Sequence, residues 1–290
     1  MKDMKTLTIV WLCGTVAAFA AAAEQRAVGT GPSFAGPLGL QLYSLRDGFK
    51  SDVDKTLDEV KAFGFRYVEL AGTYGLSAEE FRTKLDARGL VAIAGLFPME
   101  RYLKDPDGLA RDAKTLGLQY VGVAWYPHQP PFDEAQCRKM AADFNAAGRA
   151  MAERGLKFFY HNHGYEFHPW KEGTLFDLLA SETDPNLVAF EMDVLWTVFP
   201  GQDPVALLRK YGRRWELMHL KDLREGVTGD LSGKTSVTNG VVLGTGQTDF
   251  AALLKTAQEV GVRWYFIEDE SPTAREQIPA SLRFLEQLRW

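Results

Sequence analysis

Side chains that can bind a metal or move a proton are concentrated at a few points of this 290-residue chain. The densest is the stretch 157–166, KFFYHNHGYE, where an apolar aromatic run is followed at once by His161, Asn162, His163 and Glu166. Alternation along a strand would place the two histidines on one face, about 7 Å apart at roughly 3.3 Å per residue. A single His–x–His pair is equally consistent with two hydrogen-bonded histidines at a strand end.

Other apolar runs end in the same kinds of side chain. These further positions are Glu69, Glu191, Asp193, His219, Lys221, Glu268 and Glu270. A carboxylate or imidazole on a buried strand is costly unless it is paired, hydrogen-bonded or bound to a metal. Each acid alone could be a helix cap or a surface group. Together they indicate a divalent cation, and the mixture of imidazole and carboxylate suits Mn²⁺, Fe²⁺, Co²⁺ or Zn²⁺.

The polar positions follow eight runs that have the length and composition of strands. The predicted strands are Leu38–Tyr43, Tyr67–Leu70, Val91–Leu96, Tyr120–Trp125, Lys157–His161, Leu187–Asp193, Glu216–Leu220 and Trp264–Glu268. Patterns of helical period lie between them. The predicted helices cover residues 52–63, 78–88, 106–116, 133–154, 174–181, 204–211, 249–260 and 273–288. Ser77 and Glu80 have the spacing of a capping box at the start of the second helix.

Eight alternating strand–helix units predict one α/β domain, a closed (β/α)8 TIM barrel. Active sites of such barrels lie at the C-terminal ends of the strands, which is where the candidate ligands fall. A doubly wound open sheet is the alternative. It would more often carry a Gly-rich phosphate turn after its first strand, and here that turn reads YSLRDGF.

The N-terminal residues predict export. Lys2 and Lys5 precede an apolar run, and Ala20–Ala23 offers a small-residue cleavage site, so residues 1–23 have the pattern of a signal peptide. The run is shorter than the ~20 residues of a membrane span, although an uncleaved anchor is the alternative. Residues 24–36 are predicted to be a linker, and 37–290 the barrel. We therefore expect a periplasmic or secreted protein that does not contact the membrane after signal removal.

Composition narrows the partners. The chain is 46% hydrophobic and 24% charged, which is ordinary for a globular protein. Its net charge is −5, without a basic run, so nucleic acid is not an expected partner. Composition does not define the oligomeric state, and a homo-oligomer is one alternative.

Several runs resemble the xylose isomerase-like barrel family, which includes enzymes labelled sugar phosphate isomerase/epimerase. The runs are GLQLYSLRD (39–47), KFFYHNHGYEF (157–167), EMDVLW (191–196), GQDPVALLRKYGRR (201–214), MHLKD (218–222), LGTGQTDF (243–250) and FIEDE (266–270). The resemblance covers about residues 37–290. It implies a fold and a metal site but not a substrate, because the family holds isomerases, epimerases, dehydratases and an endonuclease.

The resemblance implies one divalent metal ion, with Mn²⁺ preferred and Co²⁺, Fe²⁺, Mg²⁺ or Zn²⁺ as alternatives. In the family's sugar epimerases the ligands are Glu, Asp, His and Glu from strands five to eight. Asp193, His219 and Glu268 match the last three. The first position falls at His161, where many members have Glu, and His163 and Glu166 are alternatives for it.

Because the first position holds His161 and not Glu, one of the two facing glutamates of the epimerase mechanism is missing. Lys221 and Glu166 are therefore the predicted catalytic residues, and a Lys desolvated beside a cation should have a lowered pKa. The predicted substrate contacts are His163, Glu69, Trp196, Tyr43 and Glu270. The long polar loop 223–242 is a predicted lid. Gly244-Thr245-Gly246 could cradle a phosphate or form a plain turn.

The function expected from the sequence is a metal-dependent isomerase or epimerase that moves a proton α to a carbonyl. The resemblance implies a small carbohydrate as partner, and this substrate would be unphosphorylated, because sugar phosphates are scarce outside the cytoplasm. A lyase or hydratase acting on a 3-keto-glycoside shares the enediolate step and is the first alternative. The second is a barrel that binds carbohydrate without catalysis.

Overall fold

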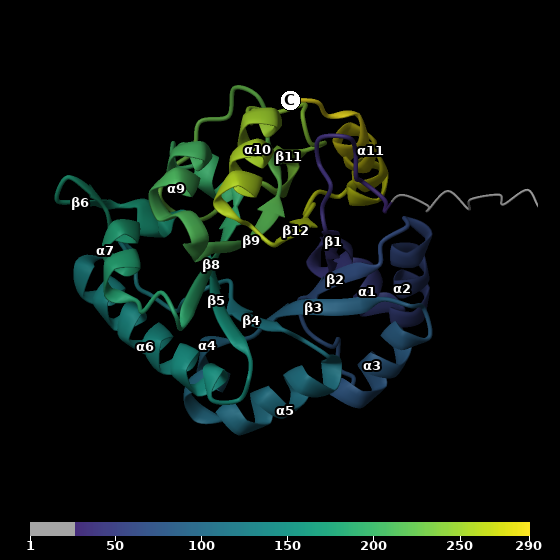
Figure 1. Ribbon diagram of the computed structural model, residues 1–290, viewed down its shortest axis with the longest axis horizontal. Coiled ribbons are helices and arrows are strands. Elements are labelled where there is room, and N and C mark those ends of the chain that lie inside the picture. Colours follow the sequence, from purple (N-terminus) through teal and green to yellow (C-terminus); the bar gives the residue numbers. More distant parts are fainter. Residues whose placement is uncertain (1–26) are drawn as a thin grey trace, which may run out of the picture.

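The computed structural model describes residues 27–290, and the predicted signal peptide lies outside this range (Figure 1). Eight parallel strands close into a barrel in the order β1-β12-β9-β8-β5-β4-β3-β2. Their bounds are β1 Leu38–Gln41, β2 Tyr67–Leu70, β3 Val91–Leu96, β4 Tyr120–Val123, β5 Lys157–His161, β8 Val188–Asp193, β9 Trp215–Leu220 and β12 Trp264–Ile267. This confirms the predicted TIM barrel and excludes the open sheet.

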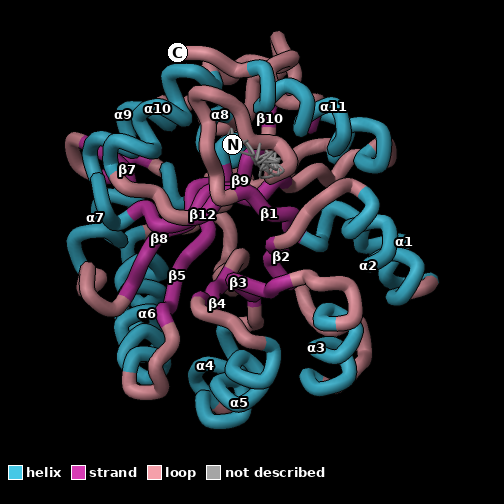
Figure 2. The backbone as a smooth tube through the Cα atoms, turned by 45° about the vertical axis from the view of Figure 1, so that its right-hand side comes forward, coloured by secondary structure: helices cyan, strands magenta, loops and turns pink. Residues whose placement is uncertain are grey.

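Helices surround the strands on the outside of the barrel (Figure 2). Their bounds are α1 Arg46–Ser51, α2 Val53–Ala62, α3 Ala78–Asp86, α4 Met99–Lys104, α5 Pro106–Leu116, α6 Glu134–Ala152, α7 Leu175–Glu182, α8 Val194–Val198, α9 Pro204–Tyr211, α10 Phe250–Val260 and α11 Ala274–Gln287. The eight predicted helices are present, and α3 has the predicted capping box. Sequence analysis missed α1, α4 and α8, which are too short to show a helical period. Within residues 27–290, no helix is long and apolar enough to cross a membrane.

Short strands and 3₁₀ turns lie in the loops between the barrel strands and the helices. Two hairpins pair β6 Pro169–Trp170 with β7 Gly173–Thr174, and β10 Asp222–Leu223 with β11 Gly240–Val241. Four 3₁₀ turns are η1 Leu42–Leu45, η2 Tyr165–Phe167, η3 Gly212–Arg214 and η4 Val237–Asn239. Several of these lie next to the C-terminal ends of the barrel strands, so they shape its mouth.

An apolar layer fills the barrel below that mouth. The ring of Phe159 from β5 packs where a Cβ on Gly122 of β4 would come within 2.4 Å, and Phe266 of β12 occupies the same position beside Gly39 of β1. Both phenylalanines are fully buried. Two glycines thus make room for two large rings, and this packed layer supports the polar side chains one step further along each strand.

The predicted linker packs onto the barrel. Residues 27–37 contain no helix or strand, yet the Phe34 side chain is fully buried and meets the Tyr265 ring edge-on at 5.1 Å. The Gly29 amide donates to the Glu286 carboxylate of α11 at 3.0 Å. The segment therefore covers part of the barrel, although its sequence is rich in Gly and Pro.

Candidate metal centre

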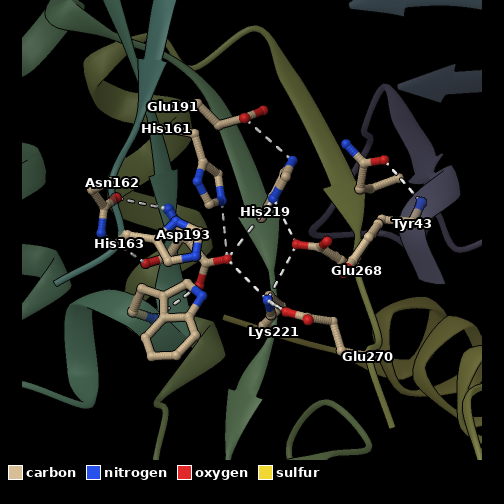
Figure 3. A network of polar contacts seen from close by, with 12 residues as sticks. Tyr43, His161, Asn162, His163, Glu191, Asp193, His219, Lys221, Glu268 and Glu270 are labelled. Carbon is tan, nitrogen blue, oxygen red and sulfur yellow. Dashed lines mark hydrogen bonds and ion pairs between the residues drawn. The ribbon is translucent and has the colours of Figure 1, made fainter. Parts of the chain in front are cut away.

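Four side chains from the ends of neighbouring strands meet inside the barrel mouth (Figure 3). His161 ends β5, Asp193 ends β8, His219 lies in β9, and Glu268 directly follows β12. Register brings them together, since Asp193 is paired with His219 and His219 with Phe266. All four are buried, and one ligand atom of each lies within 4.8 Å of the others. We call these four residues the cluster.

Polar atoms of neighbouring cluster residues lie at hydrogen-bond distances from one another. His161 Nε2 lies 3.2 Å from Asp193 Oδ2, and His219 Nδ1 lies 3.0 Å from Glu268 Oε2. The other Asp193 oxygen, Oδ1, accepts the Trp196 amide at the start of α8, which fixes the carboxylate. Two imidazoles and two carboxylates form a donor set that suits a divalent first-row metal, so the residues present fit the predicted ion.

His161 provides the first position of the cluster. Of the three residues considered for it, His161 alone contributes an atom to the group, whereas His163 and Glu166 do not. The physical reason is strand geometry: His161 is the last residue of β5 and points inward, and the chain leaves the strand at Asn162. The Asn162 side chain accepts the Asp193 amide at 2.9 Å and so joins the ends of β5 and β8.

Carboxylates also hold His219 from its other side. Its Nε2 lies 3.1 Å from Glu69 Oε1 and 3.2 Å from Glu191 Oε2, and Gln41 donates to the same Glu69 oxygen at 2.6 Å. Glu69, predicted as a substrate contact, is therefore placed below the cluster. Carboxylate partners of this kind orient a metal-binding imidazole and set its tautomer.

Sequence analysis missed the contribution of Glu191 and Gln41 to this support. Glu191 lies two residues before Asp193 on the same face of β8, and this spacing could have revealed it. Burial, and secondly the nearby Glu69, raise the pKa of Glu191 well above its ordinary value, which favours the protonated form of this carboxyl. Glu69, Glu191 and His219 form a second group with ligand atoms close together, but it shares its imidazole with the cluster.

Lys221 stands beside the cluster. Its Nζ lies 3.3 Å from Asp193 Oδ2, 3.2 Å from Glu268 Oε2 and 2.6 Å from Glu270 Oε1. Burial lowers the pKa of Lys221, but these three carboxylates outweigh it and hold the pKa well above its ordinary value. The predicted lowering of the Lys221 pKa refers to the protein with its divalent cation bound and stays a prediction; in the protein without the ion, the three carboxylates dominate.

Glu166 lies outside the candidate site. It belongs to η2, and its Oε1 accepts the His163 amide at 2.8 Å. Its neighbour Tyr160 packs against Phe144 of α6, on the outer side of β5. Burial raises the pKa of Glu166 to about 7, against weaker lowering by backbone hydrogen bonds. The structure thus corrects its predicted placement in the catalytic pocket, since the turn after Gly164 carries the side chain away from the mouth.

The remaining predicted substrate contacts line the mouth. The His163 ring stacks on Trp196 with centroids 5.0 Å apart, and the Lys221 ammonium lies 5.8 Å from the Trp196 ring. The Glu270 carboxylate forms an ion pair with the Lys221 ammonium. Tyr43 is further out, 42% exposed, with the Arg46 guanidinium over its ring. Trp196 and Glu270 therefore border the cluster directly, and Tyr43 lies at the rim.

The loop between β10 and β11 crosses the mouth, as expected of a lid. Residues 224–239, which we call the lid loop, make hydrogen bonds that end within residues 224–247 of the described chain. Ser236 and Val237 line a cavity of about 40 Å³ together with Trp196, Lys221 and Glu268. Typical ligand pockets hold roughly 300 Å³ or more. The cavity between the lid loop and the cluster is therefore smaller than a typical ligand pocket.

The Gly244-Thr245-Gly246 turn has a structural role. The amides of Gly244 and Gly246 donate to Asp222 Oδ2 at 2.9 and 2.8 Å. These are the donors that would have bound a phosphate, and a side chain of the protein already occupies them. The turn therefore fixes the hairpin at the base of the lid loop.

Fold and site together define a (β/α)8 barrel with a candidate divalent-metal centre at its C-terminal mouth. Residues 57–288 match the model of the xylose isomerase-like TIM barrel family, and the chain belongs to that family. This confirms the resemblance seen in the sequence motifs.

Individual relatives and solved structures are similar to this chain over most of its length. The chain is similar to an inosose dehydratase of Clostridium botulinum (strain Alaska E43 / Type E3), with 27% identity over 77% of this chain and 84% of that protein. A solved structure of a sugar phosphate isomerase/epimerase from Parabacteroides distasonis ATCC 8503 superposes with a TM-score of 0.72 and 26% identity, covering 87% and 98% of the two chains. The IOLI protein, solved with a bound zinc atom, shares the fold, with a TM-score of 0.67, 16% identity and coverage of 85% and 95%.

Proposed function

We propose that this protein is a metal-dependent lyase that eliminates water or an alcohol from a sugar-like ketone. The observation that carries the proposal is the buried cluster of two histidines and two carboxylates, with Lys221 paired to it at the barrel mouth. The similarity to inosose dehydratases supports elimination over the isomerisation expected from the sequence. A substrate without phosphate is supported by the Gly244 and Gly246 amides, which are bound by Asp222.

A divalent ion held by His161, Asp193, His219 and Glu268 would polarise the substrate carbonyl and so acidify the neighbouring C–H group. Lys221, held protonated by its carboxylate neighbours, donates a proton or hydrogen bond to a substrate oxygen. Glu270 is the assigned proton acceptor, because its carboxylate is ion-paired to Lys221 and lines the same cavity. Trp196 forms the apolar wall against which the ring rests.

An isomerase or epimerase is the second candidate. It is supported by the similarity to the Parabacteroides sugar phosphate isomerase/epimerase. Both reactions begin with removal of the α-proton, and they differ in whether a C–O bond then breaks. A barrel that only binds carbohydrate is less well supported, because the ligand types at the strand ends are present and buried together.

The test is a panel of free sugars, inososes and 3-keto-glycosides incubated in D₂O with the Mn²⁺-loaded protein and followed by NMR. A lyase gives a new alkene proton and a released alcohol or water, with an absorbing enone. An isomerase exchanges the α-proton without release. If neither change occurs with any ketone, although metal is bound, the proposed chemistry is wrong.

Export remains part of the proposal. The positive residues, apolar run and Ala20–Ala23 site support a mature chain that begins near Glu24 in the periplasm or outside the cell. Intact-mass measurement of protein purified from separated cell fractions checks this. A cytoplasmic protein that retains Met1 would contradict it.

A further inference from the structure

A second cavity opens directly beside the one at the cluster. Its volume is about 230 Å³, and both cavities are lined by Val237 of the lid loop and by Glu270. Pockets that hold a whole ligand measure roughly 300 Å³ or more, so a space of this size suits one part of a ligand. A molecule bound at the cluster can therefore extend into this cavity past Glu270.

The cavity has one charged side chain without an ionic partner. Besides Glu270, its charged lining residues are Arg46 and Asp47 of α1 and Arg275 of α11. Three of these four side chains are ion-paired, and the pairs are Glu270–Lys221, Asp47–Lys50 and Arg275–Glu59. Within residues 27–290, Arg46 is the only one of the four that forms no ion pair with a carboxylate. Its positive charge is therefore available to a ligand.

The Arg46 guanidinium is held in place by acceptors that do not neutralise it. Its Nη2 donates to the Glu270 carbonyl oxygen at 2.9 Å, and its Nη1 donates to the Tyr43 carbonyl oxygen at 3.1 Å. The group also lies 4.6 Å from the centre of the Tyr43 ring. A guanidinium has five N–H donors in a planar fork, so three remain after these two bonds. A positioned fork with donors to spare suits the two oxygens of a carboxylate.

Short contacts connect Arg46 to the groups assigned to the reaction. Glu270, whose carbonyl oxygen accepts from Arg46, pairs its carboxylate with the Lys221 ammonium at 2.6 Å. Lys221 in turn lies 3.2 Å from Glu268 of the cluster (Figure 3). Only the proposed acid–base pair therefore separates Arg46 from the cluster, and one small ligand can contact both.

We propose that Arg46 binds a carboxylate of the substrate, so that the ketone acted on belongs to a sugar acid, such as a uronic acid, and not to a neutral sugar. The inference rests on the proposed lyase function and specifies its substrate class. Arg46 is then a specificity-determining residue. It holds the acid group in the second cavity while the carbonyl lies at the cluster, and it takes no part in proton transfer.

The kinetic test compares methyl 3-keto-glucoside with methyl 3-keto-glucuronide, which carries a carboxylate at C6, on the full-length mature protein with Mn²⁺. We expect kcat/KM to be about tenfold higher for the acid, mainly through a lower KM, which is the effect of one hydrogen bond to a charged group. Arg46→Gln should remove this preference. Arg46→Lys, which keeps the charge but loses the fork, should retain part of it.

Arg66→Gln is the matched control for the kinetic test. Arg66 also lies over a tyrosine ring, that of Tyr67, but it precedes β2 at the opposite end of the barrel. This variant should leave both kcat/KM values unchanged. Equal kcat/KM for the two substrates in the wild type would overturn the proposal. So would an equal loss for both substrates in Arg46→Gln, because that result indicates a purely structural role.

A binding measurement separates the carboxylate site from the chemistry. Methyl glucuronide, methyl glucoside and methyl glucoside 6-phosphate, none of which has the ketone, are titrated into the Mn²⁺-loaded protein and followed by NMR. The glucuronide should bind about tenfold more tightly than the glucoside, and Arg46→Gln should lose this difference. A preference that persists in Arg46→Gln places the carboxylate elsewhere, and tighter binding of the phosphate identifies a different anion. Either result overturns the proposal. A preference that depends on Arg46, without turnover of any ketone, counts against the lyase function and leaves the carboxylate site standing.

Discussion

Carboxyl groups are buried on both sides of the barrel wall, and they behave differently. Inside, Asp193 and Glu268 face two imidazoles and the Lys221 ammonium. Burial raises the pKa of Asp193, but Lys221 and His161 together outweigh it and bring the pKa to about 2. Outside, Glu166 meets a backbone amide and the Tyr160 hydroxyl, and burial brings its pKa to about 7.

The difference shows that burial alone does not prepare an acid for a metal. A buried carboxylate without a cation nearby takes up a proton and becomes a weak ligand. One surrounded by positive donors stays ionised and can exchange those donors for a metal ion. Asp193 and Glu268 therefore provide the carboxylates of the candidate site, and Glu166 belongs to the packing between barrel and helices.

The largest expected effect comes from removing an inner carboxylate. Asp193→Asn and Glu268→Gln keep the shape of the side chain but lose its charge. Metal affinity should fall by more than the roughly 10–100-fold that loss of a supporting group costs, so little metal should be found by mass spectrometry after dialysis, and activity should fall with it. The exposed Glu172→Gln is the matched control. Full metal occupancy in both inner variants would refute the placement of the site.

Lys221→Met should lower kcat by roughly 10²–10⁴-fold, the contribution of one proton-transferring group, while metal content is unchanged. Glu166→Gln should keep turnover within about twofold, because its carboxyl lies outside the mouth. Steady-state kinetics at saturating metal measures both. Equal losses of turnover in the two variants would mean that Lys221 and Glu166 serve the same chemistry.

Replacing Glu166 should instead change the free energy of unfolding. Because it binds its proton more tightly when folded, its contribution to stability is fully present below pH 4.5 and is lost as the pH rises through about 7. The free energy of unfolding of wild type relative to Glu166→Gln should fall by about 3 kcal/mol across that window, at about 1.4 kcal/mol per pKa unit. Urea unfolding from pH 4.5 to 8 measures it. A flat difference, as expected for Glu172→Gln, would contradict the raised pKa.

The smaller of the two expected effects on metal binding concerns the support below His219. Glu69→Gln should weaken metal binding by about 10–100-fold, because the imidazole loses the carboxylate that accepts from Nε2. Glu191→Gln should change affinity less, since the raised pKa of Glu191 already favours its protonated form. Competition titration against a chelator measures both. A larger loss for Glu191→Gln would reverse the assigned charge states.

The sequence by itself determined the barrel fold and three of the four positions of the candidate metal centre. For the fourth position it left His161 among three alternatives. Strand and helix periods repeat along the chain, and parallel strands of a barrel must end on one face, so Asp193, His219 and Glu268 could be placed together without coordinates. The capping box at Ser77 could also be predicted, because it depends only on residues a few positions apart. Each of these follows from contacts that are close in sequence or imposed by the fold class.

Tertiary structure alone decided what surrounds each of those groups. The turn at Gly164 sends Glu166 outward although it lies five residues after His161, and no periodicity extends through such a turn. The charge state of Lys221 depends on Asp193, Glu268 and Glu270, which come from two other strand ends. The Trp125 ring packs against His163 and Tyr165, two rings that follow β5. Electrostatics and packing depend on distance in space, and only the closed barrel brings these residues within range of one another.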